Sequence, residues 1–247
     1  MATPQKIRCR VQKIIDHGDQ VYTVDLVPNR PVPRFKPGQF LHLTLDDYDP
    51  SGFWPESRVF SIASSPAQRN ILRISYSVRG RYTARMENEL HEDMSVWVKL
   101  PYGDFVIQDA KNVVLLAGGT GITAFVAFVD GLADEFYNDI FLAYGARKPE
   151  LLLYRDLIDV KTENGAGFHA AYFVENGQTN DKCGAGPSQS TRFFTGCLSL
   201  DAIWARVKLP REATYYTAGP PSMIQYLTVS LQKKEISPEK IRVDAWE

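Results

Sequence analysis

The chain has 247 residues, of which 44% are hydrophobic and 23% charged, and its formal net charge is -1 at pH 7. That length fits one large domain or two of about 100–150 residues, and a near-neutral charge gives no electrostatic footprint for nucleic acid or an anionic membrane. No apolar run approaches the ~18 residues that span a bilayer, and the polar N-terminus has no signal-peptide core. We therefore expect a cytoplasmic protein.

The first part of the chain, residues 1–108, has a β pattern. Short segments rich in Val, Ile, Tyr and Phe are separated by turn formers such as Lys36-Pro-Gly. A helical patch, Thr83 to Leu90, interrupts them. Six such segments predict a small antiparallel β-barrel. The expected strands are residues 7–15, 20–27, 39–45, 58–63, 71–78 and 95–100.

After residue 108 the pattern changes to alternating strands and helices, which predicts a parallel sheet covered on both faces over residues 109–247. A polar, glycine-rich stretch, residues 176–196, predicts a long surface loop. The expected strands are residues 112–117, 139–144, 168–174, 213–218 and 240–244. The expected helices are residues 122–136, 149–162, 199–207 and 221–235.

The cysteines are few and widely spaced, at Cys9, Cys183 and Cys197, with no Cys-x-x-Cys pair. This spacing predicts no iron–sulfur centre and no structural zinc site. Cys183 and Cys197 could pair in an oxidising compartment, but free thiols are the expectation in the cytosol.

A glycine-rich segment, Gly118-Gly-Thr-Gly-Ile-Thr123, lies between an apolar strand and a helix. Glycines let a phosphate approach the backbone, and the free N–H groups of the first helical turn face the negative charge. The alternative is a tight turn without a ligand. A plain Rossmann dehydrogenase is disfavoured, because the tip of the second strand, Tyr144-Gly-Ala-Arg147, has no acid for the ribose hydroxyls.

Two further motifs lie in the β half. In Arg58-Val-Phe-Ser61 the guanidinium suits a phosphate, the Phe60 ring suits a flat ligand and the hydroxyl can bond a heteroatom. Gly80-Arg-Tyr-Thr83 opens a helix whose N-terminus could bind a second phosphate, with Thr83 as the cap. Taken singly, these residues are better explained as a core Phe, a solvated Arg and an ordinary capped helix.

In combination the motifs are specific. The order R-x-[Y/F]-S, G-x-x-[S/T], GGTGIT, Ala218-Gly-Pro-Pro-Ser-Met223 and a C-terminal aromatic, Trp246, resembles the ferredoxin–NADP reductase family from Ile7 onward. The resemblance is strongest to the bacterial ferredoxin/flavodoxin reductase branch. It implies a FAD-binding barrel at residues 1–108 and an NAD(P)-binding α/β domain at residues 109–247.

The resemblance also implies an activity: a FAD-dependent NAD(P)H oxidoreductase that passes electrons from hydride, through flavin N5, to a one-electron carrier. FAD is favoured over FMN. The carrier, a ferredoxin, flavodoxin or oxygenase component, would be a separate chain because no cluster is encoded here. A diffusible flavin or quinone reductase, or a non-catalytic flavin- or nucleotide-binding regulatory module, are the alternatives.

By similarity, each half of the chain supplies a set of cofactor-binding residues. The expected catalytic residues are three: Ser61 would lie near flavin N5, Trp246 would cover the flavin face, and Asp244 would lie near the nicotinamide. The alternatives are that Trp246 is a C-terminal residue docked in an apolar groove and that Asp244 is a surface acid at the end of the last strand. The expected FAD-binding residues are Arg58, Phe60, Ser61, Tyr76, Ser77, Val78, Gly80, Arg81, Tyr82 and Thr83. The expected nicotinamide dinucleotide-binding residues are Gly118, Gly119, Thr120, Gly121, Ile122, Thr123, Gly219, Pro220 and Met223.

Two positions depart from the family pattern, because Phe60 and Ala218 stand where Tyr and Cys are usual. For cofactor choice, the third strand of the α/β half ends in Glu175, where NADPH-using relatives present a Ser-Arg pair. A carboxylate repels a 2′-phosphate and accepts hydrogen bonds from a diol. Arg147 at the neighbouring strand tip acts in the opposite sense, and the balance favours NADH.

The loops of the barrel half are rich in arginine. A basic surface of this kind would suit an acidic ferredoxin or flavodoxin, although solvated side chains or phosphate binding explain it equally well. The arginines are Arg69, Arg73, Arg79, Arg81 and Arg85.

Overall fold

The structure, a computed structural model, describes residues 3–107, 111–132, 139–164, 167–176 and 191–244. The chain divides into two compact units: the first comprises Met1–Val106 together with Val126–Phe128, and the second comprises Ile107–Phe125 and Val129–Glu247. Each unit has its own sheet and its own apolar core.

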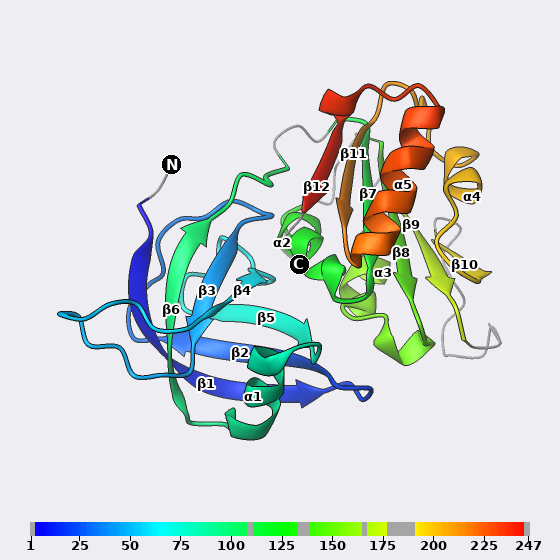
Figure 1. Cartoon of the computed structure of the whole chain (residues 1–247). Helices are drawn as coiled ribbons and strands as arrows, with labels where there is room; N and C mark the ends of the chain where they lie inside the picture. Colours follow the sequence, from blue (N-terminus) through cyan, green and yellow to red (C-terminus); the bar gives the residue numbers. More distant parts are fainter. Residues whose placement is uncertain (1–2, 108–110, 133–138, 165–166, 177–190, 245–247) are drawn as a thin grey trace. The chain divides into compact units, whose positions relative to one another are not determined.

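The first unit is an antiparallel β-barrel (Figure 1). In its described residues the strands pair in the order β4-β3-β6-β1-β2-β5, every pair antiparallel. The Ala63 N–H donates to the Arg73 carbonyl oxygen at 2.8 Å, which links the segment after β4 to β5 and joins the two ends of the sheet. The predicted six-stranded barrel is confirmed. The strands are β1 (Gln5–Asp16), β2 (Val21–Pro28), β3 (Phe40–Thr44), β4 (Arg58–Ser61), β5 (Leu72–Ser77) and β6 (Ser95–Tyr102).

Period-two alternation fills the barrel interior. In β1 the side chains of Ile7 and Val11 are buried, whereas Arg8 between them is exposed. Helix α1 (Arg81–Glu89) adds the fully buried Met86 to the same core. An apolar interior of this size holds the β4 and β5 strand ends and the start of α1 in place.

The second unit is a parallel sheet with the strand order β10-β9-β8-β7-β11-β12 in its described residues. From β7 the chain builds outward through β8 to β10, then crosses to β11 and β12 on the other side. The order therefore reverses between β7 and β11, and in such sheets ligands bind beyond the carboxyl ends of the strands at that point. The strands are β7 (Val113–Gly118), β8 (Ile140–Ala146), β9 (Phe168–Val174), β10 (Thr191–Thr195), β11 (Thr214–Ala218) and β12 (Ile241–Asp244).

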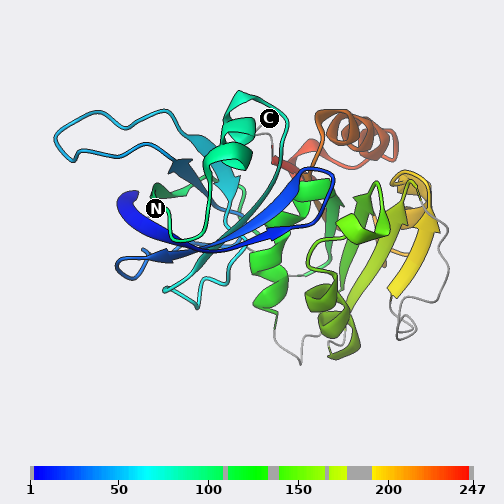
Figure 2. The ribbon, with the colours of Figure 1, turned by 90° about the horizontal axis from the view of Figure 1, so that it is seen from below.

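Helices cover both faces of this sheet (Figure 2). Helices α4 (Leu200–Trp204) and α5 (Pro221–Lys233) lie on one face, and α2 (Thr123–Asp130) and α3 (Arg155–Asn164) on the other. Short 3₁₀ helices are η1 (Gly119–Ile122), η2 (Pro149–Leu151) and η3 (Pro238–Lys240). The predicted parallel sheet between helical layers is confirmed. No helix in the described ranges combines the length and the hydropathy needed to cross a bilayer.

Two expectations were wrong in detail. The predicted loop 176–196 contains a strand at its end, β10, which pairs with β9 in parallel register up to Thr195↔Val174. Its β-branched and aromatic residues follow a glycine-rich stretch that concealed them; residues 177–190 lie outside the described ranges. The predicted helix 149–162 is interrupted because Tyr154, between η2 and α3, has a φ of 59°, outside the helical region.

Candidate functional site

The glycine-rich segment forms a tight turn at the carboxyl end of β7. Gly118 ends the strand, residues 119–122 form η1, and α2 begins at Thr123, whose hydroxyl donates to the Thr120 carbonyl oxygen at 2.8 Å. Gly119 has a φ of 53°, a left-handed conformation that favours glycine. A Cβ added there would meet no atom within 4 Å, so this part of the turn is open to an approaching ligand.

The other two glycines of the turn pack against the loop that follows β11. Ala218, at the end of β11, is paired in register with Ala117 of β7. A Cβ on Gly121 would lie 2.4 Å from the Ala218 carbonyl oxygen, and one on Gly118 would lie 2.5 Å from Met223 Sδ. The two loops therefore touch backbone to backbone, and glycine is required for that contact before any ligand is considered.

The loop after β11 also contains a glycine with a positive φ that packs closely against the facing loop. Gly219 has a φ of 147°, and a Cβ there would lie 2.9 Å from the Gly118 carbonyl oxygen. Pro220 is the N-cap residue of α5, and Met223 in its first turn is half-buried. The structure thus brings the predicted residues Gly118–Thr123, Gly219, Pro220 and Met223 together at the switch point of the sheet.

Asp244 lies at the same edge, because β12 pairs with β11 in the register Ala218↔Asp244. Its side chain is half-buried. The predicted position of this carboxylate near the nicotinamide stays a prediction. Trp246, predicted to cover a flavin, lies outside the described residues.

Arg147 and Glu175 lie side by side at the carboxyl edge of β8 and β9. The Glu175 N–H donates to the Ala146 carbonyl oxygen at 3.1 Å, and the Asn176 N–H donates to the Arg147 carbonyl oxygen at 2.8 Å. Both side chains are exposed. The Glu175 carboxylate, expected to accept hydrogen bonds from a ribose diol, and the Arg147 guanidinium, expected to attract a 2′-phosphate, are therefore both available at this edge.

Cys197 joins this edge and was not singled out from the sequence. The Gly196 N–H donates to the Val174 carbonyl oxygen at 2.8 Å, which places Cys197 beside Glu175. The negative charge of Glu175, then burial, then a hydrogen bond with Glu175 raise the pKa of the exposed Cys197 thiol. The one sequence signal that could have placed Cys197 at this edge was the strand character of residues 191–195, which precede it.

In the barrel unit, the motif residues of β4 differ in how far their side chains are exposed to solvent. Arg58 is exposed, and no acidic partner for it exists among the described residues. Ser61 is half-buried, whereas the Phe60 ring is 8% exposed and belongs to the apolar core, 6.0 Å from the Tyr76 ring. Arg58 is thus available for an anion, and contact of Phe60 with a flat ligand stays a prediction.

The end of β5 is fixed by local contacts. The Tyr76 ring is buried and stacks on Tyr22 with centroids 5.5 Å apart; burial raises the pKa of Tyr76. Ser77 Oγ accepts from Arg79 Nε at 3.2 Å, and the Val78 N–H donates to the Gln20 carbonyl oxygen at 2.9 Å.

At the start of α1, the side chains of Tyr82 and Thr83 are already engaged. Thr83 does not cap the helix from its N-terminal end; Gly80 is the N-cap residue, and Thr83 Oγ1 accepts from the Arg79 and Gly80 N–H groups at 2.9 and 3.1 Å. The Tyr82 hydroxyl bonds the backbone of β3, donating to the Leu43 carbonyl oxygen at 3.0 Å. A phosphate here would therefore meet backbone N–H groups and the Arg81 side chain.

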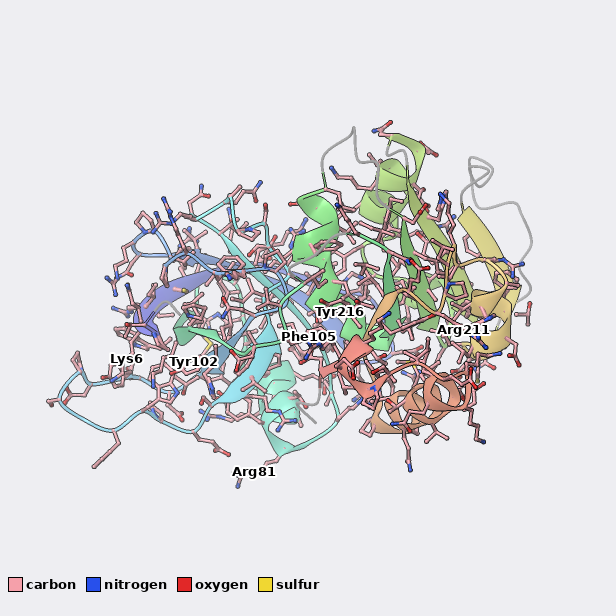
Figure 3. The ribbon with its side chains drawn as sticks, turned by 90° about the horizontal axis from the view of Figure 1, so that it is seen from above. Lys6, Arg81, Tyr102, Phe105, Arg211 and Tyr216 are labelled. Carbon is pink, nitrogen blue, oxygen red and sulfur yellow. The ribbon has the colours of Figure 1, made fainter. Side chains whose placement is uncertain are left out.

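Arg81 projects away from the ribbon (Figure 3). Its Nη2 lies 2.6 Å from Glu56 Oε1, an ion pair between side chains that are 86% and 52% exposed. Glu56 belongs to the loop between β3 and β4, two residues before Arg58. No local pattern predicts this pairing, because the two residues lie 25 positions apart in the chain.

The other arginines of the barrel loops have partners too. Arg73 binds Asp25 through two hydrogen bonds of 2.6 and 2.7 Å. Arg85 binds Asp46 at 2.6 Å and also pairs with Glu89. The Arg69 side chain donates to the Val32 carbonyl oxygen at 2.7 Å. Most of the charge expected for a basic docking surface is therefore balanced within the unit.

A metal centre is not part of either site as far as the structure describes it. The described residues contain no group of three or more His, Cys, Asp or Glu side chains that could hold a metal ion.

Comparison with known proteins finds similarity in both halves of the chain. Residues 115–228 match the family model of the oxidoreductase NAD-binding domain. The flavohemoprotein of Bordetella pertussis is 26% identical over 222 residues, 87% of this chain and 53% of that protein. Reductase component 2 of the terephthalate 1,2-dioxygenase of Comamonas sp. is 30% identical over 131 residues, 51% of this chain and 37% of that protein. The chain spans about half the length of the flavohemoproteins that it matches.

Solved structures agree on the fold. The cytochrome P450 reductase of Amycolatopsis superposes with a TM-score of 0.79 at 21% identity, over 98% of this chain and 70% of that one. A ferredoxin NADP+ reductase of Neisseria gonorrhoeae, with bound FAD and NADP, gives 0.73 at 18% identity over 99% of both chains. The chain has the ferredoxin–NADP reductase fold.

The fold that the motif resemblance implied is thereby confirmed. The segment that matches the NAD-binding domain of oxidoreductases begins in β7 and ends in α5, so it contains both loops of the switch point. In this fold the two glycine-bearing loops and the Arg58 and Gly80 motifs of the barrel belong to different units, as the two-part sequence pattern predicted.

Proposed function

We propose that this reductase-fold chain is a FAD-dependent NAD(P)H oxidoreductase that passes electrons to a separate carrier protein. FAD would bind to residues 1–108 and the nicotinamide dinucleotide to residues 109–247. The observation that carries the proposal is the pair of interlocked loops at the switch point, inside a segment that matches an oxidoreductase NAD-binding domain. The barrel with its Arg58 and α1 motifs supplies the second phosphate site.

The barrel residues fit a dinucleotide flavin. Arg58 is exposed without an acidic partner in the described ranges, and a Cβ at Gly80 would meet no atom within 4 Å, so a pyrophosphate can approach both. FAD, when bound, supplies hydride acceptance from NAD(P)H and release of single electrons. Arg58 would bind the pyrophosphate through its fork of donors, and Ser61 would donate a hydrogen bond near N5.

On the α/β side, the open face of Gly119 and the N–H groups of the first turn of α2 would bind the dinucleotide phosphates. Pro220 and Met223 would flank the nicotinamide. Asp244 would contact the same ring, and Trp246 would cover the flavin face until nicotinamide displaces it. Ala218 would leave the neighbourhood of the reacting carbon without the thiol that the family usually has.

We infer a preference for NADH. Glu175 is exposed at the carboxyl end of β9, where its carboxylate can accept hydrogen bonds from a ribose diol and repel a 2′-phosphate. Arg147 is exposed beside it and would attract that phosphate.

The electron acceptor would be a ferredoxin, a flavodoxin or an oxygenase component. The terephthalate dioxygenase reductase and the reductase of a carbazole dioxygenase, which shares the fold, serve oxygenase systems. A cytoplasmic location completes the proposal, and the free Cys9 and Cys197 thiols are compatible with it.

Reconstitution tests the proposal. Purified protein incubated with FAD and desalted should remain yellow, and it should reduce cytochrome c with NADH far faster when a ferredoxin is added. Rapid turnover with free flavin or quinone and no gain from ferredoxin would favour the diffusible reductase instead. Protein that retains FAD but is never reduced by NADH would indicate the regulatory module, and protein that retains no FAD would end the proposed function.

A further inference from the structure

The ion pair between Arg81 and Glu56 places a carboxylate at a position that the proposed function assigns to a phosphate. Arg81 is the first residue of α1, and Gly80 before it is the N-cap residue. Glu56 Oε1 lies 2.6 Å from Arg81 Nη2. Arg58, two residues after Glu56, has no acidic partner among the described residues. One of the two arginines expected to bind pyrophosphate is therefore occupied, and the other is open.

Electrostatics favours this arrangement in the absence of an anionic ligand. The N-terminal end of a helix carries partial positive charge, and its first-turn N–H groups lack intrahelical partners. No acidic side chain lies in the first turn of α1 itself. Glu56 comes from the β3–β4 loop. Its carboxylate supplies negative charge near the start of the helix and forms an ion pair with Arg81 at the same time.

We propose that Glu56 is an internal counter-anion that holds Arg81 in the flavin-free protein and competes with the FAD pyrophosphate for it. The inference rests on the proposed FAD site. When FAD binds, its pyrophosphate replaces the Glu56 carboxylate on Arg81. The contribution of Arg81 to the binding free energy of FAD is therefore reduced by the free energy of the ion pair that is broken. Glu56 thus lowers the affinity of the barrel for its flavin and makes flavin release easier.

The expected size of the effect follows from exposure. Both side chains are largely accessible to water, 86% for Arg81 and 52% for Glu56. Ion pairs of this kind are weak, so removal of Glu56 should tighten FAD binding by roughly two- to fivefold rather than by orders of magnitude. Salt screens both the pair and its competitor, so the gain should shrink at high ionic strength.

Titration of flavin-free protein with FAD, followed by flavin fluorescence, tests this. Glu56→Gln keeps the size of the side chain and removes its charge, and it should lower the Kd for FAD by roughly two- to fivefold. Glu89→Gln is the matched control, because Glu89 pairs with Arg85 on the same helix at 2.9 Å and is 47% exposed. The control should leave the Kd unchanged. A Kd that rises in Glu56→Gln would overturn the proposal, since Glu56 would then position Arg81 for FAD.

A double-mutant cycle separates masking of Arg81 from general repulsion. In an Arg81→Gln background, Glu56→Gln should give little or none of its gain in FAD affinity. An equal gain in both backgrounds would contradict the proposal, and so would an unchanged Kd in the single variant. Thermal unfolding of each flavin-free variant checks that the barrel is intact. If the wild-type protein binds no FAD at all, the proposed function fails; if it binds FAD and Glu56→Gln changes nothing, only this inference fails.

Discussion

Replacement of Gly121 by alanine tests whether the two loops at the switch point form one nicotinamide site. The added Cβ would lie 2.4 Å from the Ala218 carbonyl oxygen, 2.5 Å from its carbonyl carbon and 2.6 Å from the Gly219 nitrogen. All three are backbone atoms, so no side chain can rotate away and the loop after β11 must move. Overpacking of this kind costs about 1–3 kcal/mol, which corresponds to a fall of roughly 3–10 °C in the unfolding midpoint of the α/β unit.

The assay compares NADH affinity, FAD affinity and thermal unfolding in three proteins. Gly121→Ala should weaken NADH binding by at least about tenfold, because the displaced loop carries Gly219 and Pro220. FAD affinity should be unchanged, because the flavin residues belong to the barrel unit. Gly52→Ala is the matched control: it lies in an exposed loop, and its added Cβ would meet the Asp49 carbonyl oxygen at an ordinary 3.4 Å. That variant should match the wild type within about 0.5 kcal/mol.

Wild-type NADH affinity together with an unchanged midpoint in Gly121→Ala would refute the reasoning. It would mean that the close approach of the two loops is not needed for the nicotinamide site. Loss of FAD binding in the same variant would contradict the assignment of the two cofactors to separate units.

Four further predictions concern individual side chains. Arg58→Gln should weaken FAD binding by roughly 10- to 100-fold in an equilibrium titration, because a charge-assisted hydrogen bond to phosphate is lost; an unchanged Kd would remove Arg58 from the site. Thr83→Val should lower the free energy of unfolding, measured in urea, by about 1 kcal/mol, since two backbone N–H groups lose their acceptor. Equal unfolding curves for the two proteins would argue against a stabilising role for these hydrogen bonds. Glu175→Arg should shift the ratio of kcat/KM toward NADPH by roughly tenfold, and an unchanged ratio would refute its role in cofactor choice. Glu175→Gln should speed alkylation of Cys197 at mildly alkaline pH, because the charge that raises the thiol pKa is gone and the thiolate fraction grows. Buried Cys9, whose pKa is raised to about 12 by burial, should stay unlabelled in every variant; peptide mass spectrometry reads both sites.

Most of the fold could be predicted because it depends on local patterns. Period-two alternation marks strands such as β1, and continuous apolar runs mark the buried strands β7 and β8. The turn after β7 was predictable because a left-handed residue such as Gly119 requires glycine. These signals lie within a few residues of one another in the chain.

What could not be predicted depends on contacts between distant segments. β10 is an edge strand whose pairing with β9 follows a long glycine-rich stretch, and the local composition there favours a loop. The positive φ at Tyr154 interrupts a segment with helical periodicity and has no compositional sign. The pairing of Arg81 with Glu56 requires that α1 start beside the β3–β4 loop, which only the folded barrel determines.

In the candidate site, too, local patterns predict some features, whereas others depend on contacts between distant segments. The sequence identified the glycines at Gly118 and Gly121 as ligand-binding, but the structure assigns part of their role to packing against Ala218 and Met223. It identified Phe60 as a ring-stacking residue, and the structure buries that ring in the barrel core. Residue type and spacing predict which chemistry is present, whereas the surroundings determine which atoms are free to take part in it.

Anaerobic rapid mixing of the FAD-loaded protein with NADH tests the central claim most directly. We predict that the visible absorbance of the flavin bleaches within the mixing experiment, at a rate that saturates with NADH concentration, because the nicotinamide binds before it transfers hydride. We also predict that Gly121→Ala needs a much higher NADH concentration to reach saturation. Flavin that stays oxidised in the presence of saturating NADH and NADPH would contradict the account.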